Sequence, residues 1–83
     1  NIYNPYPQEK INLPLNFKLN ETFKKNIQNL LVHSKNENSH LRYLVRESGT
    51  EPLLRLLVEG KDELEVKKEI DNLLTNVKKI LNV

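Results

Sequence analysis

The residues best suited to chemistry lie in one ten-residue stretch that begins at Arg46 and ends at Arg55 and reads Arg-Glu-Ser-Gly-Thr-Glu-Pro-Leu-Leu-Arg. Ser48 and Thr50 each carry a hydroxyl donor, and Gly49 between them allows the backbone to turn so that successive N–H groups point the same way. Such N–H groups form a concave site for phosphate oxygens. Arg46 and Arg55 add planar, permanently charged groups that bind phosphate bidentately. The stretch therefore predicts an anion-binding loop.

The same composition also fits a purely structural turn. Apolar-rich runs at residues 40–45 and 54–58 flank the stretch and predict two paired strands joined by a polar hairpin turn. Such a turn needs no ligand if its arginines pair with Glu47, Glu51 or Glu59. Glu51 is also unfavourable beside a bound dianion unless it faces away or pairs with an arginine, so we expect a structural role for it.

The pattern before the loop predicts a strand and a helix. Residues 10–18 alternate, with one apolar face made of Ile11, Leu13, Leu15 and Phe17. Pro14 lacks a donor, which places this strand at a sheet edge or at a bulge. Asn20 is the expected cap of a helix that begins at Glu21 and fades near Ser34, followed by a polar loop over residues 35–39. Its apolar stripe is Phe23, Ile27, Leu30 and Leu31.

The pattern after that loop predicts two strands and a second helix. The strands cover residues 40–46 and 53–59 and form an antiparallel hairpin. Asp62 and Glu65 resemble a capping box at the start of the helix. The helix carries the longest apolar stripe of the chain, Val66, Ile70, Leu73, Leu74, Val77 and Leu81. The β-α-β-β-α order predicts an α+β two-layer sandwich, with a mostly antiparallel sheet and both helices on one face.

Composition fits one small domain. The chain has 83 residues, of which 37% are hydrophobic and 29% charged, and it has no Cys, which excludes a disulfide framework and a thiolate zinc site. The net charge of +2 is spread over lysines interleaved with acids. We therefore expect solvated faces and neither nucleic-acid nor membrane binding, with nucleic-acid binding as the weaker alternative. His33 and His40 lack ligand spacing, so we predict no metal site.

The order of residues in the loop resembles that of the α-D-phosphohexomutases. Arg-x-Ser-Gly-Thr-Glu-Pro-x-x-Arg is similar to the phosphate-binding loop of their last domain, and residues 56–60 resemble the segment that follows it in bacterial phosphoglucosamine mutases. Upstream, Pro5-Tyr6-Pro7-Gln8 and Asn16 resemble the run that opens this domain in the same subfamily. The resemblance covers nearly the whole chain.

The resemblance implies a TATA-binding-protein-like fold and a role in binding substrate phosphate. Residues 1–9 would be an interdomain linker and residues 10–83 the C-terminal phosphate-binding domain of a larger mutase. The chain has no Met, even at position 1, and we expect it to be a C-terminal piece. The complete enzyme would interconvert glucosamine 6-phosphate and glucosamine 1-phosphate through a bisphosphate intermediate. The residues that would hold the phosphate that is not reacting are Arg46, Ser48, Gly49, Thr50 and Arg55.

The resemblance also implies what lies outside these residues. The family's phosphoserine loop, metal-binding loop and sugar-selecting loop have no counterpart here, so we expect no catalytic residue in this chain and no activity from it alone. The complete enzyme would be cytoplasmic and use magnesium, and the preceding domains would be the partners of this one. Two alternatives stay open: the same domain of a phosphomannomutase or phosphoglucomutase, and a non-enzymatic interaction domain with an incidental polar turn.

Overall fold

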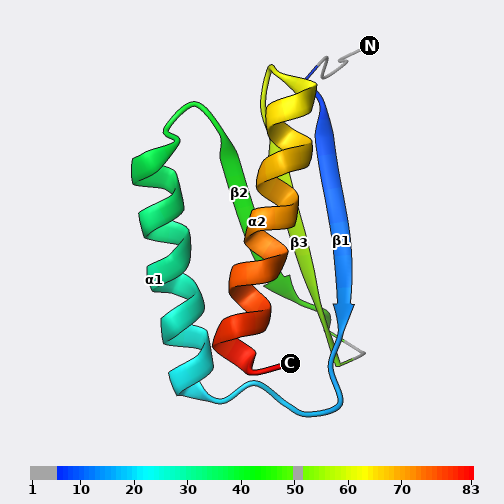
Figure 1. Ribbon diagram of the computed structural model, residues 1–83. Helices are drawn as coiled ribbons and strands as arrows, with labels where there is room; N and C mark the ends of the chain where they lie inside the picture. The colour runs from blue at the N-terminus through cyan, green and yellow to red at the C-terminus, as the bar shows by residue number, and fades with distance from the viewer. Residues whose placement is uncertain (1–5, 50–51) are drawn as a thin grey trace.

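The computed structural model describes residues 6–49 and 52–83 and has the element order β-α-β-β-α. The elements are β1 (Gln8–Pro14), α1 (Glu21–Glu37), β2 (Arg42–Glu47), β3 (Leu53–Glu59) and α2 (Glu63–Leu81). The strands form one antiparallel sheet in the order β1-β3-β2, so β3 pairs on both sides. Both helices cover the same face of this sheet (Figure 1). The predicted two-layer α+β architecture is confirmed.

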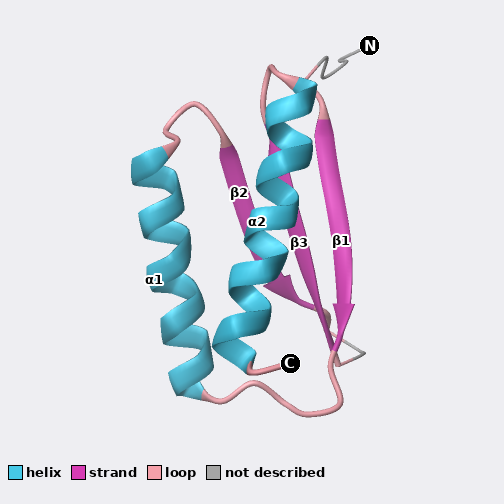
Figure 2. Cartoon of the chain, viewed as in Figure 1, coloured by secondary structure: helices cyan, strands magenta, loops and turns pink. Residues whose placement is uncertain are grey.

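The core lies between the sheet and the helices, the two layers that Figure 2 distinguishes by colour. On β3, Leu54 and Leu56 are 1% exposed and Val58 is 0% exposed, because alternate residues of a strand point to the same face. They meet the stripe of α2, whose buried members are Val66, Ile70, Leu73, Val77 and Leu81. α2 contacts β3 and β1, α1 contacts β2, and the helices contact each other.

The opposite face of the sheet carries no helix among the described residues, and its side chains form rows across the strands. We call the row at one end the paired row; it consists of Gln8, Glu59 and Arg42. We call the row nearest the β2–β3 turn the arginine row; it consists of Asn12, Arg55 and Arg46. Lys10, Leu57 and Leu44 lie between them. This face is called the open face below.

The first strand lies earlier in the chain than the predicted 10–18. Gln8 pairs with Glu59 because β3 extends far enough to supply a partner. After Pro14 the chain leaves the sheet. Of the predicted linker, residues 1–9, the first five lie outside the described residues, and the last two belong to β1. Pro14 ends an edge strand, so its predicted edge position is confirmed.

The first helix extends further than predicted. Asn20 caps it as expected, with its Oδ1 accepting from the backbone N–H of Phe23 at 2.8 Å. The predicted end near Ser34 is wrong, because α1 continues to Glu37 and the Ser34 carbonyl accepts from the N–H of Asn38 at 2.9 Å. The last turn faces solvent, where polar residues suffice, and Lys35 suits the negative end of the helix dipole.

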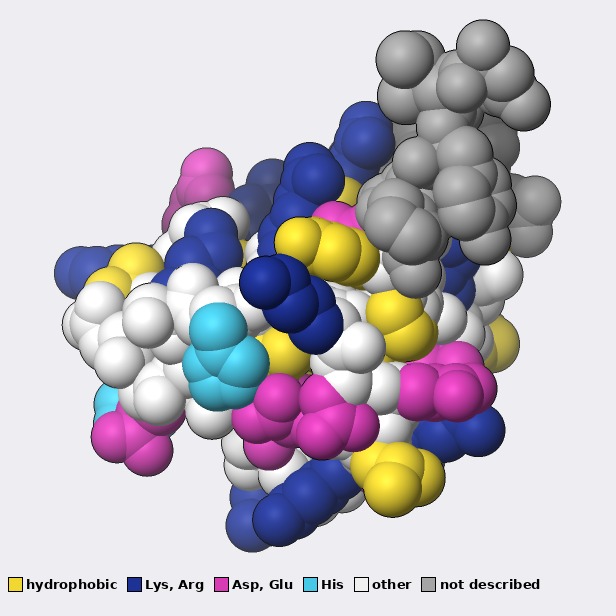
Figure 3. Space-filling view, turned by 90° about the horizontal axis from the view of Figure 1, so that it is seen from above, with side chains coloured by type: hydrophobic (Ala, Val, Ile, Leu, Met, Phe, Trp, Pro, Cys, Tyr) yellow, Lys and Arg dark blue, Asp and Glu magenta, His cyan; other side chains and the backbone are white. Residues whose placement is uncertain are grey.

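The end of the molecule where α2 begins is held by polar contacts. Asp62 caps α2 as predicted, accepting from Leu64 at 3.0 Å. The carboxylate of Glu65 lies 2.8 Å from the ring of His40 instead of closing a capping box, and β2 begins two residues after that histidine. Figure 3 looks onto this end and shows a histidine beside acidic side chains.

Neither helix combines the length and apolarity that crossing a bilayer requires.

Tyr43 is the buried polar side chain of β2 on the helix side of the sheet. Its hydroxyl donates to Glu69 of α2 at 2.9 Å. Burial, followed by this hydrogen bond and the negative charge of Glu69, raises the pKa of Tyr43 well above its ordinary value. The contact connects the start of β2 to α2.

Candidate functional site

The β2–β3 turn lies at the end of the sheet where β1 also ends, away from the start of α2 (Figure 1). The N–H of Ser48 donates to the carbonyl of Leu53 at 3.0 Å, and the N–H of Leu15 donates to the carbonyl of Pro52 at 2.6 Å. The turn is therefore fastened both to itself and to the chain that follows β1. Because the N–H of Ser48 is used inside the turn, it does not join the predicted row of N–H donors.

Gly49 shows no backbone requirement for glycine in the described structure. Its φ is not positive, and a Cβ built on it would meet no atom within 4 Å. We predicted that the backbone would need glycine here in order to turn, but another residue could adopt this conformation. What Gly49 does provide is open space beside the turn, where a ligand can approach the backbone closely.

Arg46 and Arg55 lie directly opposite each other on β2 and β3. Residues opposite in an antiparallel pair have Cα atoms roughly 4.5–5.5 Å apart and side chains on one face. Both arginines are exposed on the open face. Like charges at such positions repel, so this arrangement costs stability unless an anion lies between the guanidinium groups.

The acids available to these arginines pair elsewhere within the described residues. Glu47 points to the helix side and lies 3.7 Å from Lys24 of α1. Glu59, which is only 7% exposed, accepts from Gln8 at 2.8 Å and lies 3.7 Å from Arg42. Glu51 and Thr50 are outside the described residues. A purely structural turn would pair its arginines with Glu47, Glu51 or Glu59. Two of these three acids, Glu47 and Glu59, pair with other cations instead.

The predicted site residues line two separate hollows. Arg46 and Arg55 line a hollow of about 430 Å³ on the open face, which we call the open-face hollow. Ser48 and Gly49 line a hollow of about 450 Å³ between the turn and the chain that connects β1 to α1, which we call the loop hollow. The structure thus brings the two arginines together, and it also brings Ser48 and Gly49 together. The two pairs lie on two sides of the same turn.

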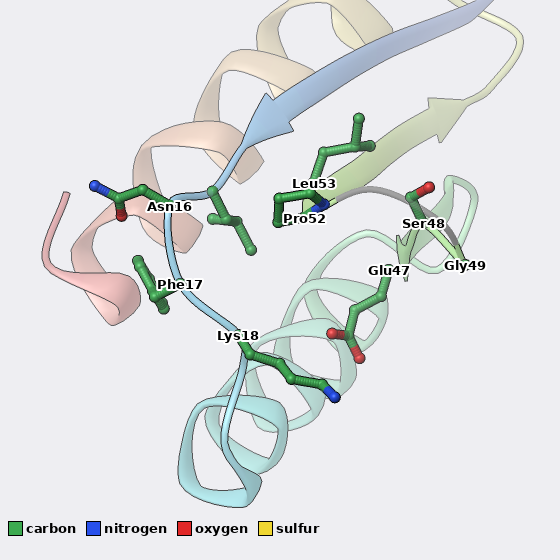
Figure 4. A pocket seen from close by; sticks show the side chains of 9 residues that line it. Asn16, Phe17, Lys18, Glu47, Ser48, Gly49, Pro52 and Leu53 are labelled. Carbon is green, nitrogen blue, oxygen red and sulfur yellow. The ribbon is translucent and has the colours of Figure 1, made fainter.

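The loop hollow has an apolar lining with a polar rim (Figure 4). Leu15, Phe17 and Leu53 contribute the apolar part. Lys18 points toward Glu47 across the hollow, whereas Asn16 points away from it. Asn16, which the family resemblance singled out, therefore lies beside the turn without directing its amide into the hollow.

Two further polar side chains line the open-face hollow beside the arginines. They are Lys10 and Asn12 of β1, and Asn12 lies opposite Arg55. The sequence contains a signal for them, since they alternate with the apolar residues of the first strand. It does not contain the pairing of β1 with β3, which alone places them next to Arg55.

Metal binding requires several ligands at one place. Among residues 6–49 and 52–83, no group of three His, Cys, Asp or Glu side chains lies close enough to hold a metal ion. These residues therefore supply no ligand set for the magnesium that the resemblance implies for a complete enzyme.

Comparison with known proteins identifies relatives along nearly the whole chain. The family model for the C-terminal domain of phosphoglucomutase/phosphomannomutase matches residues 14–76. A phosphoglucosamine mutase of Prochlorococcus marinus (strain MIT 9312) is 37% identical over 90 residues, covering 96% of this chain and 20% of the relative. One of Caldicellulosiruptor saccharolyticus is 36% identical, covering 98% of this chain and 19% of the relative. One of Campylobacter jejuni is 40% identical, covering 94% and 17%.

These relatives are much longer than the chain, which spans about a fifth of their length. The match nonetheless includes the whole of α1, β2 and β3 and most of α2, but of β1 only its last residue, Pro14. The arginine row and the turn lie inside it. The chain therefore belongs to the phosphohexomutase family, in which it corresponds to the C-terminal domain of phosphoglucomutase/phosphomannomutase.

Proposed function

We propose that this chain is the substrate-phosphate-binding domain of a phosphoglucosamine mutase. The complete enzyme interconverts glucosamine 6-phosphate and glucosamine 1-phosphate through a bisphosphorylated intermediate. The proposed site residues are Arg46, Ser48, Gly49, Thr50 and Arg55. The two arginines hold the phosphate that is not reacting from the open face, and the other three belong to the turn that joins their strands. Support comes from family membership and from the names of relatives at 36–40% identity.

The observation that carries the proposal is the opposition of Arg46 and Arg55 across β2 and β3. No acid of the described residues neutralises them, because Glu47 and Glu59 pair with other cations. A phosphate dianion between two guanidinium groups removes their repulsion and accepts charge-assisted hydrogen bonds from both. The arrangement is unfavourable without an anion and favourable with one.

Holding the distal phosphate contributes to catalysis without touching the reacting atoms. A fixed phosphate orients the rest of the sugar, so that its hydroxyl approaches the transferred phosphoryl group in line. Binding energy from this remote contact then supports the alignment of the reacting groups. The turn is suited to this task because it is fastened to Leu15 and to Leu53 rather than suspended freely.

The rest of the reaction belongs to the preceding domains of the same enzyme, which we propose as the partners of this chain in the cytoplasm. Phosphoryl transfer, the magnesium site and sugar selection all lie there. The isolated chain is therefore inactive as a mutase, and it binds the phosphates of glucosamine, mannose and glucose with similar affinity. A phosphomannomutase or phosphoglucomutase domain would share this behaviour.

The proposal is tested by an amide chemical-shift titration of the 83-residue chain with glucosamine 6-phosphate. We expect shifts in residues 46–49 and 52–55 and a dissociation constant in the millimolar range, since a single clamp supplies about 4 kcal/mol. Arg46→Ala should abolish the shifts. The matched control is Arg42→Ala, on the same strand and face but paired with Glu59, which should leave binding unchanged.

The outcomes separate the candidate functions. Equal loss in both arginine variants would show nonspecific attraction to a basic face and would contradict the proposed site. No shift with any sugar phosphate would favour the non-enzymatic interaction domain. Assay of the complete enzyme with glucosamine, mannose and glucose phosphates then distinguishes a phosphoglucosamine mutase from the two sister activities.

A further inference from the structure

The open-face hollow is lined by more cations than the two arginines. Lys10 joins Arg46 and Arg55 in its lining, Asn12 supplies an amide, and none of the acids in residues 6–49 and 52–83 lines it. Its volume of about 430 Å³ falls within the range of small-molecule sites, roughly 300–1,000 Å³. Three positive charges and an amide around one hollow favour an anionic ligand.

We propose that the phosphate site extends across the sheet onto β1, with Lys10 as a third cation and Asn12 as a neutral donor to the same phosphate. The inference rests on the proposed function and adds two ligands to it. The ligand class is a phosphate monoester, and the new contacts come from the edge strand rather than from the β2–β3 turn.

Strand geometry places both side chains within reach. Asn12, Arg55 and Arg46 stand in one row across three strands, and neighbouring strands are roughly 4.8 Å apart. Lys10 lies one row further from the turn, opposite Leu57, which is a displacement of roughly 6.6 Å along the strand. Because a lysine stem is about this long, its ammonium can reach the arginine row.

The acid next to Lys10 is already engaged. Glu59 lies in the adjacent paired row, where it accepts from Gln8 and pairs with Arg42. Glu9, the chain neighbour of Lys10, pairs with Val58 and so faces the helix side. Within the described part of the chain, no ion pair neutralises Lys10. Its charge is therefore available to a ligand.

The hollow also has an apolar floor beside the lysine. Leu44 and Leu57 lie in the same row as Lys10, and both line the hollow. Apolar walls lower the local dielectric constant, so a cation beside them attracts an anion more strongly than a fully solvated one does. Lys10 should for this reason contribute more to phosphate binding than a lysine on a helix surface.

The test is a chemical-shift titration of the 83-residue chain with inorganic phosphate at two ionic strengths. Lys10→Met should weaken binding about three- to tenfold and reduce its dependence on salt. Lys10→Glu should weaken it further, and Asn12→Asp, which places an acid opposite Arg55, should weaken it at least about tenfold. The matched control is Lys25→Met on the exposed side of α1, which should leave binding unchanged.

Each outcome decides a different point. If the unmodified chain binds phosphate and Lys10→Met and Lys10→Glu bind equally well, the extension to β1 is wrong while the site at Arg46 stands. If the unmodified chain binds no phosphate, the proposed function is wrong, and the extension to β1, which depends on it, is wrong too. If Lys25→Met weakens binding as much as Lys10→Met, net charge rather than position accounts for the effect, which also overturns the inference.

Discussion

The paired row and the arginine row lie on the same face of the same three strands, but their arginines have different partners. In the paired row, Arg42 lies 3.7 Å from Glu59, which is nearly buried. In the arginine row, Arg46 faces Arg55, and no acid of the described residues compensates them. The antiparallel pairing is common to both rows, so they differ in the charge and the burial of their side chains.

This difference separates a contact that stabilises the fold from one that is suited to binding. Opposite charges across a strand pair stabilise by about 0.2–1 kcal/mol, whereas like charges at the same positions destabilise. A site for an anion needs the second arrangement, because a charge already paired offers less to a ligand. The loss of stability in one row is small compared with what the shared core contributes.

The largest change in stability is expected from removing Glu59, the acid of the paired row. Glu59→Ala should lower the free energy of unfolding by about 1–3 kcal/mol, because the substitution removes the shared partner of Gln8 and Arg42. Urea denaturation of the purified chain measures this. Glu63→Ala, in the exposed pair with Lys67, is the control and should change stability by no more than about 0.5 kcal/mol. Equal effects would show that the paired row is not a stabilising contact.

A smaller loss of stability is expected from a substitution at Tyr43, which lies on the helix side of β2 between the positions of the two rows. Tyr43→Phe should cost about 1 kcal/mol at pH 7 through the lost hydrogen bond to Glu69 and should leave phosphate binding intact. The folded state raises the pKa of Tyr43, so this stabilisation is complete below about pH 10 and declines as the pH rises above it. Denaturation at pH 8 and pH 10.5 should show the two proteins converging. A constant difference would contradict this account of the phenol.

The smallest effect on stability is expected from giving the arginine row an acid. Arg46→Glu should raise the free energy of unfolding by about 0.2–1 kcal/mol, since it places opposite charges on β2 and β3, and should abolish phosphate binding. The same change in the other row, Arg42→Glu, sets an acid opposite Glu59 and should lower stability. Two changes of the same sign would show that local charge does not distinguish the rows.

Much of the fold was predictable from periodicity. The strand at 53–59 and the stripe of α2 follow directly from alternation and from helical spacing, and both are confirmed. The end of α1 was not predictable, because Lys35 and the two residues after it face solvent and carry no apolar signal. The start of β1 was missed because Gln8 and its neighbour depend on partners in β3.

The sequence by itself determined the residue types near the turn and their resemblance to a family loop. It also determined which residues of each strand share a face, since that period is fixed by backbone geometry. Only the tertiary structure decided that Arg46 stands opposite Arg55, that Glu59 is directed to Arg42, and that Lys10 shares a hollow with the arginines. The physical reason is that register and strand order are set by the pairing of distant segments across a common core, and no local pattern contains them.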